Sequence, residues 1–262
     1  MVRNKNFYAF NVSCHGASHL REGKPCQDYS SSWSTGNMAI ASVADGHGGK
    51  LYFRSDRGSR FAVETAIECI KQLIAIRNTV LPKPDESLNI LKRSIIAAWH
   101  GKIANDARRD PINGDTILPY GTTLLAAAIT GHYWFVIQIG DGKCVVINKD
   151  GSISQPVPCD ESCFLNLTTS LCDEEADIIF RYFYSETLPD AIFLGSDGLE
   201  NSFPVNKNEE YLAIIYKRIH DNFMKEGLLN GESHLREMLP LLTQKGSGDD
   251  ISIAGIIRIK EA

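Results

Sequence analysis

Four short segments of the chain place an aspartate beside glycine where an apolar run ends or begins. They are Ala44-Asp45-Gly46-His47-Gly48-Gly49, Gly140-Asp141-Gly142, Ser196-Asp197-Gly198 and Gly248-Asp249-Asp250. Divalent cations such as Mg²⁺ and Mn²⁺ bind several oxygen ligands, and carboxylates at strand ends are held on a rigid frame. Neighbouring glycines let the backbone turn sharply and approach an ion. The pattern therefore indicates a metal centre built from aspartates.

A single Asp-Gly pair says little, because this dipeptide is favoured in ordinary turns. Four such segments in one chain are harder to explain in this way. Three of them directly follow an apolar run, and the fourth directly precedes one. Several unpaired carboxylates that meet at one sheet edge would repel each other unless a cation neutralised them. The fold is therefore expected to bring these turns together.

The elements that carry the turns can be read from the hydrophobic pattern. Runs rich in Val, Ile, Phe and Tyr predict strands. They span residues 7–14, 38–44, 122–130, 133–139, 144–148, 178–184, 191–194 and 251–259. Helical periodicity predicts helices over residues 58–77, 86–109, 209–223 and 232–242. Strands grouped on either side of a helical pair favour an α+β fold over regular βαβ alternation.

Composition narrows the class of protein. The 262 residues fit one large domain, and 43% apolar with 23% charged residues is ordinary for a soluble globular protein. The net charge of −5 gives no sign of a nucleic-acid-binding surface. The chain has no apolar stretch of about 20 residues and no signal-peptide pattern, so neither a membrane span nor secretion is expected. Seven cysteines without a disulfide-scaffold spacing suggest reduced thiols in a cytoplasmic protein.

Five short motifs occur along the chain, and both their order and their spacing carry information. They are Asp45-Gly46-His47-Gly48-Gly49, Tyr120-Gly121-Thr122-Thr123, Gln138-Ile139-Gly140-Asp141-Gly142, Leu194-Gly195-Ser196-Asp197-Gly198-Leu199 and Asp249-Asp250-Ile251-Ser252. In order and spacing they resemble the metal-dependent protein phosphatases of the 2C type, over nearly the whole chain. The block Gly16-Ala17-Ser18-His19, followed by Pro25-Cys26-Gln27-Asp28, is similar to a bacterial-like subgroup of that family.

The resemblance implies an architecture. It is a four-layer α-β-β-α sandwich in which two central antiparallel sheets are flanked by helix pairs, with the metals at one end between the sheets. Residues 1–262 would form a single catalytic domain, and residues 151–189 occupy the place of the family's variable flap. The implied cofactors are two or three Mn²⁺ or Mg²⁺ ions. The implied reaction is hydrolysis of phosphoserine or phosphothreonine in proteins, by direct attack of a metal-activated water.

The resemblance also implies roles for individual residues. Asp45 would bridge two metals, and the carbonyl of Gly46 would complete one coordination shell. Asp197 and Asp249 would hold the other metal, and Asp141 would share a weaker third ion with Asp197. His47 would be the general acid that protonates the leaving alkoxide; a turn histidine without chemistry is the competing interpretation.

The N-terminal block departs from the commoner family pattern. Many members have Glu-Asp where this chain has Gln27-Asp28, so Asp28 is expected to contact the metals and Gln27 to be a weaker or water-mediated metal contact. Many also have an arginine for the substrate phosphate where Gly23 stands. His19, Arg21 and Lys24 are the candidates to replace it, and His19 and Arg21 are preferred, since a guanidinium can grip two phosphate oxygens.

Two other functions remain open from the sequence. A pseudophosphatase that only binds phosphorylated proteins is the first, and a metallohydrolase of small phosphoesters is the second. The chain has neither a nucleotide-binding P-loop nor a Ser or Cys nucleophile motif. The expected partners are a phosphorylated protein substrate and a cognate Ser/Thr kinase, with no nucleic acid and no membrane. A monomer is expected.

Overall fold

Ten strands and seven α-helices make up the chain in this computed structural model, which describes residues 7–158, 160 and 168–259. The strands are Phe7–Cys14 (β1), Asp28–Thr35 (β2), Met38–Asp45 (β3), Leu124–Ile129 (β4), Trp134–Ile139 (β5), Lys143–Ile147 (β6), Ile153–Ser154 (β7), Arg181–Ser185 (β8), Ala191–Gly195 (β9) and Ile251–Arg258 (β10). The helices are Ala17–Glu22 (α1), Ser55–Ile76 (α2), Pro84–Arg109 (α3), Ala176–Ile179 (α4), Asp197–Glu200 (α5), Asn208–Glu226 (α6) and Leu228–Lys245 (α7).

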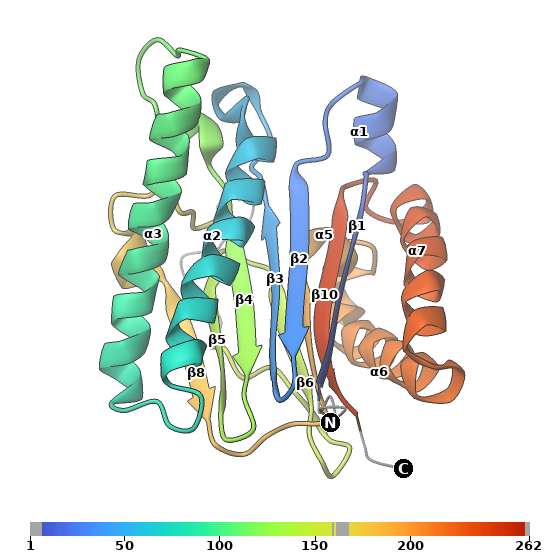
Figure 1. Cartoon of the computed structure of the whole chain (residues 1–262). Helices are drawn as coiled ribbons and strands as arrows, with labels where there is room; N and C mark the ends of the chain where they lie inside the picture. The colour runs from blue at the N-terminus through green and yellow to red at the C-terminus, as the bar shows by residue number, and fades with distance from the viewer. Residues whose placement is uncertain (1–6, 159, 161–167, 260–262) are drawn as a thin grey trace.

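Two five-stranded sheets form the central layers. One has the strand order β1-β10-β9-β6-β7 and the other β2-β3-β4-β5-β8, and the paired strands run antiparallel. Helices α2 and α3 cover the outer face of the second sheet, and α6 and α7 cover the first (Figure 1). The predicted four-layer α-β-β-α sandwich is therefore confirmed.

The strand β3 shows why this arrangement suits the sequence. Ala39, Ala41 and Val43 are buried against the opposite sheet, whereas Ile40 and Ala44 are buried under the α2–α3 side. Both faces of the strand are therefore covered, which explains its continuous apolar run. Burial of apolar surface in all three interlayer spaces is the main force that holds the frame of the site in place.

Several local predictions differ from the structure. The four long helices are present with shifted ends, but residues 178–184 are not one strand: the chain forms α4 first, and β8 begins only at Arg181. Neither β2 nor α1 was predicted. The serines of β2 bond to β1 through their hydroxyls; for example, Ser32 Oγ donates to Asn11 Oδ1 at 2.9 Å.

The segment 151–189 contributes to the frame at both ends. Its β7 pairs with β6, and its β8 pairs with β5, so each end of the segment extends one of the two sheets. Residue 159 and residues 161–167 of the predicted flap lie outside the described residues. Of the cysteines that the structure describes, Cys14, Cys26, Cys69, Cys144 and Cys172 are free thiols. Within the described ranges, no helix combines the length and the apolar character needed to cross a bilayer.

Candidate active site

A cleft of about 530 Å³ lies at the end of the sandwich where β3 ends and β10 begins. The residues that line it are His19, Gln27, Asp45, Gly46, His47, Gly48, Thr123, Asp141, Thr168, Asp197, Asn201 and Asp249. All four aspartate turns therefore meet at one place, although they come from both sheets. This convergence is what the spacing of the turns predicted.

Asp45 is held by the segment that precedes β4. The carbonyl oxygen of Asp45 accepts from Thr122 Oγ1 at 2.8 Å and from the Thr123 backbone N–H at 2.9 Å. Its own N–H donates to Thr123 Oγ1 at 3.0 Å. The two threonines thus fix the backbone of Asp45 from both sides and leave its side chain for the cleft.

Gly46 occupies a space that no other residue fits. A Cβ atom at this position would lie 2.5 Å from the Ser55 carbonyl oxygen at the start of α2 and 2.9 Å from the Gln27 carbonyl oxygen. The Gly46 N–H donates to that Gln27 carbonyl at 3.1 Å. The missing side chain therefore lets three parts of the chain close together beside Asp45.

Asp197 stands at the start of α5, directly after β9. Its Oδ2 accepts from Asn201 Nδ2 at 2.8 Å, whereas its Oδ1 is buried and has no hydrogen-bond donor among the described residues. Asn201 also lines the cleft, and the sequence analysis missed it. Its position four residues after Asp197, one helical turn away, is the signal that could have identified it.

The buried carboxylates of the cleft form a site that favours a bound cation. Burial raises the pKa of Asp45 well above its usual range, and Asp28 and Asp197 add repulsion. Burial likewise raises the pKa of Asp197 to about 6, and the neighbouring charge of Asp141 adds to this shift. No lysine or arginine of the described residues lines the cleft. Hard oxygen donors without a positive partner are what Mg²⁺ and Mn²⁺ require, so the residues present fit two such ions.

His47 is placed to act on a molecule in the cleft. Its ring packs edge-on against Tyr52 with centroids 5.0 Å apart, and a Cβ on Gly121 would reach within 2.9 Å of His47 Cδ2. Its Nε2 is buried without a hydrogen-bond partner among the described residues. Burial lowers the pKa of His47, and the charges of Asp141 and Asp173 oppose that shift. The ring of His47 is therefore held beside the cleft, with one nitrogen that no described residue contacts by a hydrogen bond.

Some predicted site residues lie elsewhere or face differently. Asp28 is opposite Asp45 in the β2–β3 register but is buried behind the cleft, where its Oδ2 accepts from Ser196 Oγ at 2.7 Å. Gln27 lines the cleft, yet its Nε2 donates to the His47 carbonyl at 2.9 Å and so braces the loop. Arg21 is exposed on α1 and is not among the lining residues.

A sandwich of two antiparallel sheets with an aspartate cleft and a poised histidine defines a class, the metal-dependent phosphatases. A family model described as Protein phosphatase 2C matches residues 15–240. The chain therefore belongs to the protein phosphatase 2C family, whose members are metal-dependent protein serine/threonine phosphatases that use Mn²⁺ or Mg²⁺ and act on phosphorylated proteins. The predicted family, activity and cofactors are confirmed, and the alternative functions are not favoured.

Solved structures show the same fold at low sequence identity. A bacterial serine phosphatase matches with a TM-score of 0.65 and 19% identity over 98% of this chain and 99% of that chain. Serine/threonine phosphatase Stp1 from Staphylococcus aureus matches at 0.62 and 17%, over 97% and 96%. The catalytic domain of the phosphatase PstP in complex with two manganese ions matches at 0.62 and 16%, over 97% and 99%. A search of curated proteins found no significant match.

Proposed function

We propose that this chain removes phosphate from phosphoserine or phosphothreonine in proteins at the aspartate cleft, with Asp45, Asp197 and Asp249 as the ligands of two divalent cations. The observation that supports it most is the meeting of these three carboxylates in one cleft that no described lysine or arginine lines, where burial raises the pKa of Asp45 and Asp197. Asp141 lines the same cleft and suits a weaker third ion, and the Gly46 carbonyl would complete one shell. Bound Mn²⁺ or Mg²⁺ would neutralise the phosphate and activate the attacking water.

His47 would supply the proton in this scheme. The phosphoester oxygen of serine or threonine is a poor leaving group as an alkoxide, so the reaction needs a proton donor at that oxygen. His47 lines the cleft, and its buried Nε2 has no hydrogen-bond partner among the described residues, while Gln27 and Tyr52 hold the loop and the ring. The negative charge of a bound phosphate would favour the protonated imidazole and so counteract the effect of burial.

We also propose a partner, an oligomeric state and a location for this chain. A cognate Ser/Thr kinase would form the substrate, the chain would act as a monomer in the cytoplasm, and residues 1–262 would form one catalytic domain with 151–189 as its flap. Asp28 would act on the metals only from behind Asp45, through its charge. Arg21, exposed on α1, would reach a substrate phosphate only on a substrate that extends beyond the cleft.

The test is hydrolysis of phosphoserine, phosphothreonine and phosphotyrosine peptides with Mn²⁺, with chelator, and in three variants. We expect Asp45→Asn and Asp249→Asn to lose at least about a hundredfold in kcat/KM, because each removes a charge that holds a cation. Asp141→Asn should instead raise the Mn²⁺ concentration that gives half-maximal activity. Asp221→Asn on α6, outside the cleft, is the matched control. Full activity in excess chelator, or in Asp45→Asn, would contradict the proposal.

A further inference from the structure

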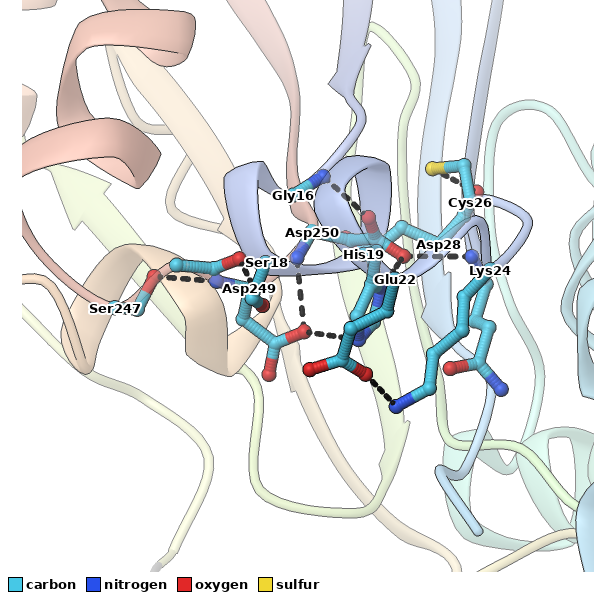
Figure 2. A network of polar contacts seen from close by, with 12 residues as sticks. Gly16, Ser18, His19, Glu22, Lys24, Cys26, Asp28, Ser247, Asp249 and Asp250 are labelled. Carbon is cyan, nitrogen blue, oxygen red and sulfur yellow. Dashed lines mark hydrogen bonds and ion pairs between the residues drawn. The ribbon is translucent and has the colours of Figure 1, made fainter. Parts of the chain in front are cut away.

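The short helix α1 places a histidine between the two aspartates that begin β10. His19 Nδ1 lies 3.0 Å from Asp250 Oδ2, and His19 Nε2 lies 3.4 Å from Asp249 Oδ1 (Figure 2). The His19 side chain is 15% exposed and lines the aspartate cleft. Its two ring nitrogens therefore face different surroundings: one a buried carboxylate, and the other a carboxylate of the proposed metal site.

Asp250 is a fixed anchor, and it does not line the cleft. Its side chain is only 2% exposed, and its two oxygens accept from the Gly16 N–H at 2.5 Å and the Gln27 N–H at 2.6 Å. These bonds join both ends of the N-terminal block to the start of β10. His19 Nδ1 faces this carboxylate at ion-pair distance and has no hydrogen-bond partner among the described residues, so the negative charge of Asp250 is what orients the ring.

The whole helix α1 is locked against the same turn. Ser18 donates to the Gly248 carbonyl through its N–H at 2.8 Å and through its Oγ at 2.6 Å. A Cβ on Gly16 would lie 2.5 Å from the carbonyl carbon of Asp249, so the helix begins in direct contact with this turn. His19 is therefore held in place on α1 beside Asp249.

Histidines that bind metals nearly always give their other ring N–H to a carboxylate or carbonyl, which orients the ring. Two ligand atoms at right angles on an ion with bonds of about 2.1 Å lie about 3.0 Å apart, close to the separation of His19 Nε2 and Asp249 Oδ1. His19, Asp249 and Asp250 are also a group whose donor atoms lie within 4.8 Å of one another. We propose that His19 Nε2 is a ligand of the divalent cation that Asp249 holds, oriented by Asp250.

This assignment rests on the proposed function for the cation itself, and it makes the centre a mixed oxygen and nitrogen site. Imidazole binds Mn²⁺, Co²⁺ and Zn²⁺ in preference to Mg²⁺, which favours oxygen donors. The chain should therefore prefer Mn²⁺ over Mg²⁺ by more than an all-oxygen site would. It also changes the role of His19 from a contact to the substrate phosphate to a contact to the metal.

The test measures metal binding directly. Calorimetric titration with Mn²⁺ and with Mg²⁺ compares the wild type with His19→Gln and with His15→Gln. His15 is the matched control, because it lies four residues away and its Nε2 contacts the Lys24 carbonyl at 2.9 Å outside the cleft. We expect His19→Gln to weaken Mn²⁺ binding by about tenfold or more, with a much smaller change for Mg²⁺, and His15→Gln to leave both unchanged.

Pulsed electron paramagnetic resonance of bound Mn²⁺ in protein with isotopically labelled histidine nitrogen gives a second readout. We expect a nitrogen coupling in the wild type and in His47→Ala, and its loss in His19→Gln. If the wild type binds Mn²⁺ without such a coupling, the assignment is overturned while the proposed function stands, and this measurement needs no variant to fold. A His19→Gln variant that changes only the KM for phosphopeptide would equally overturn it. A wild type that neither binds Mn²⁺ nor hydrolyses phosphopeptides would instead refute the proposed function.

Discussion

Gln27 shows how one side chain can differ in role from what its neighbours in sequence suggest. The resemblance to the family predicts a weak oxygen contact to the metals at this position. The structure directs the amide nitrogen into the protein, where it donates to the His47 carbonyl at 2.9 Å and to Ser55 Oγ at 2.6 Å. Gln27 thus ties the loop that carries His47, the proposed general acid, to the start of α2, and a carboxylate could not donate to the His47 carbonyl.

Gln27→Glu should therefore destabilise the site instead of improving it. The variant loses the hydrogen bond to the His47 carbonyl and places a negative charge against that oxygen, which together cost roughly 1–3 kcal/mol of unfolding free energy. We expect a lower Tm without metal and a lower kcat with Mn²⁺. Gln244→Glu on the exposed side of α7 adds the same charge elsewhere and is the control. A Gln27→Glu variant with tighter Mn²⁺ binding and an unchanged Tm would show that the side chain faces the metals.

His47→Ala should have an effect that depends on the leaving group. A serine alkoxide needs a proton as it leaves, whereas the phenolate of an aryl phosphate leaves readily without one. We expect kcat to fall about a hundredfold or more on a phosphoserine peptide and much less on an aryl phosphate. The test measures the hydrolysis rates of both substrates with the wild type and with the variant. Equal losses of kcat on the two substrates would exclude a proton-donating role for His47.

At the scale of elements, α2 packs tightly on the segment before β4. Gly58 lets the helix approach so closely that a Cβ there would lie 1.9 Å from the Tyr120 carbonyl oxygen. The Gly58 carbonyl also accepts from Trp99 Nε1 of α3 at 3.0 Å. Tyr120 leads directly into the two threonines that clamp Asp45, so the contact transmits the position of α2 to the metal site.

Gly58→Ala should consequently push Tyr120 away and loosen the clamp on Asp45. We expect a loss of roughly 3 kcal/mol in unfolding free energy and weaker Mn²⁺ binding, since the overlap is with backbone that cannot move alone. Gly101→Ala on α3, where nothing lies within 4 Å, is the matched control. It should be stabilising by about 0.5–1 kcal/mol, because alanine favours the helix. Thermal unfolding and calorimetric metal titration of the two variants provide the comparison.

At the scale of the whole molecule, the metals would join the two sheets. Asp45 ends a strand of one sheet, whereas Asp197 and Asp249 adjoin strands of the other. In the absence of a cation these carboxylates repel each other across the sandwich. Burial raises the pKa of Asp28 to about 8 and that of Asp197 to about 6, both above the value of about 3.9 for an unfolded aspartate.

The stability of the metal-free protein should therefore fall as the pH rises. Groups with a raised folded-state pKa add stability that is fully present below the unfolded pKa and is lost as the pH passes the folded values, here between about 4 and 8. Bound Mn²⁺ takes the place of the protons on these carboxylates. The rise in the Tm of the protein on adding Mn²⁺ should therefore be larger at pH ~7.5 than at pH ~5. Differential scanning calorimetry with and without Mn²⁺ measures this, and Asp45→Asn should lose most of the increase. Equal increases at both pH values would contradict the expectation.

The sequence alone determined the nature of the site and most of its frame. Asp45, Asp141, Asp197 and Asp249 were recognisable because an aspartate beside glycine at a strand end is a local pattern, and the long helices were recognisable from their period. The strand β2 was not, because its serines satisfy partners on β1 that no local pattern reveals. Asn201 was missed although its spacing from Asp197 was visible.

Only the tertiary structure decided how these residues meet. His19 and Asp250 are 231 positions apart, yet they are in contact, because α1 docks on the turn before β10. Likewise, the direction of the Gln27 amide depends on where α2 begins, and the burial of Asp28 depends on Ser196 from the other sheet. Residue types and their spacing determine local secondary structure, because these preferences act over only a few neighbouring residues. Contacts between distant segments follow from packing, which is settled only when all the layers close together.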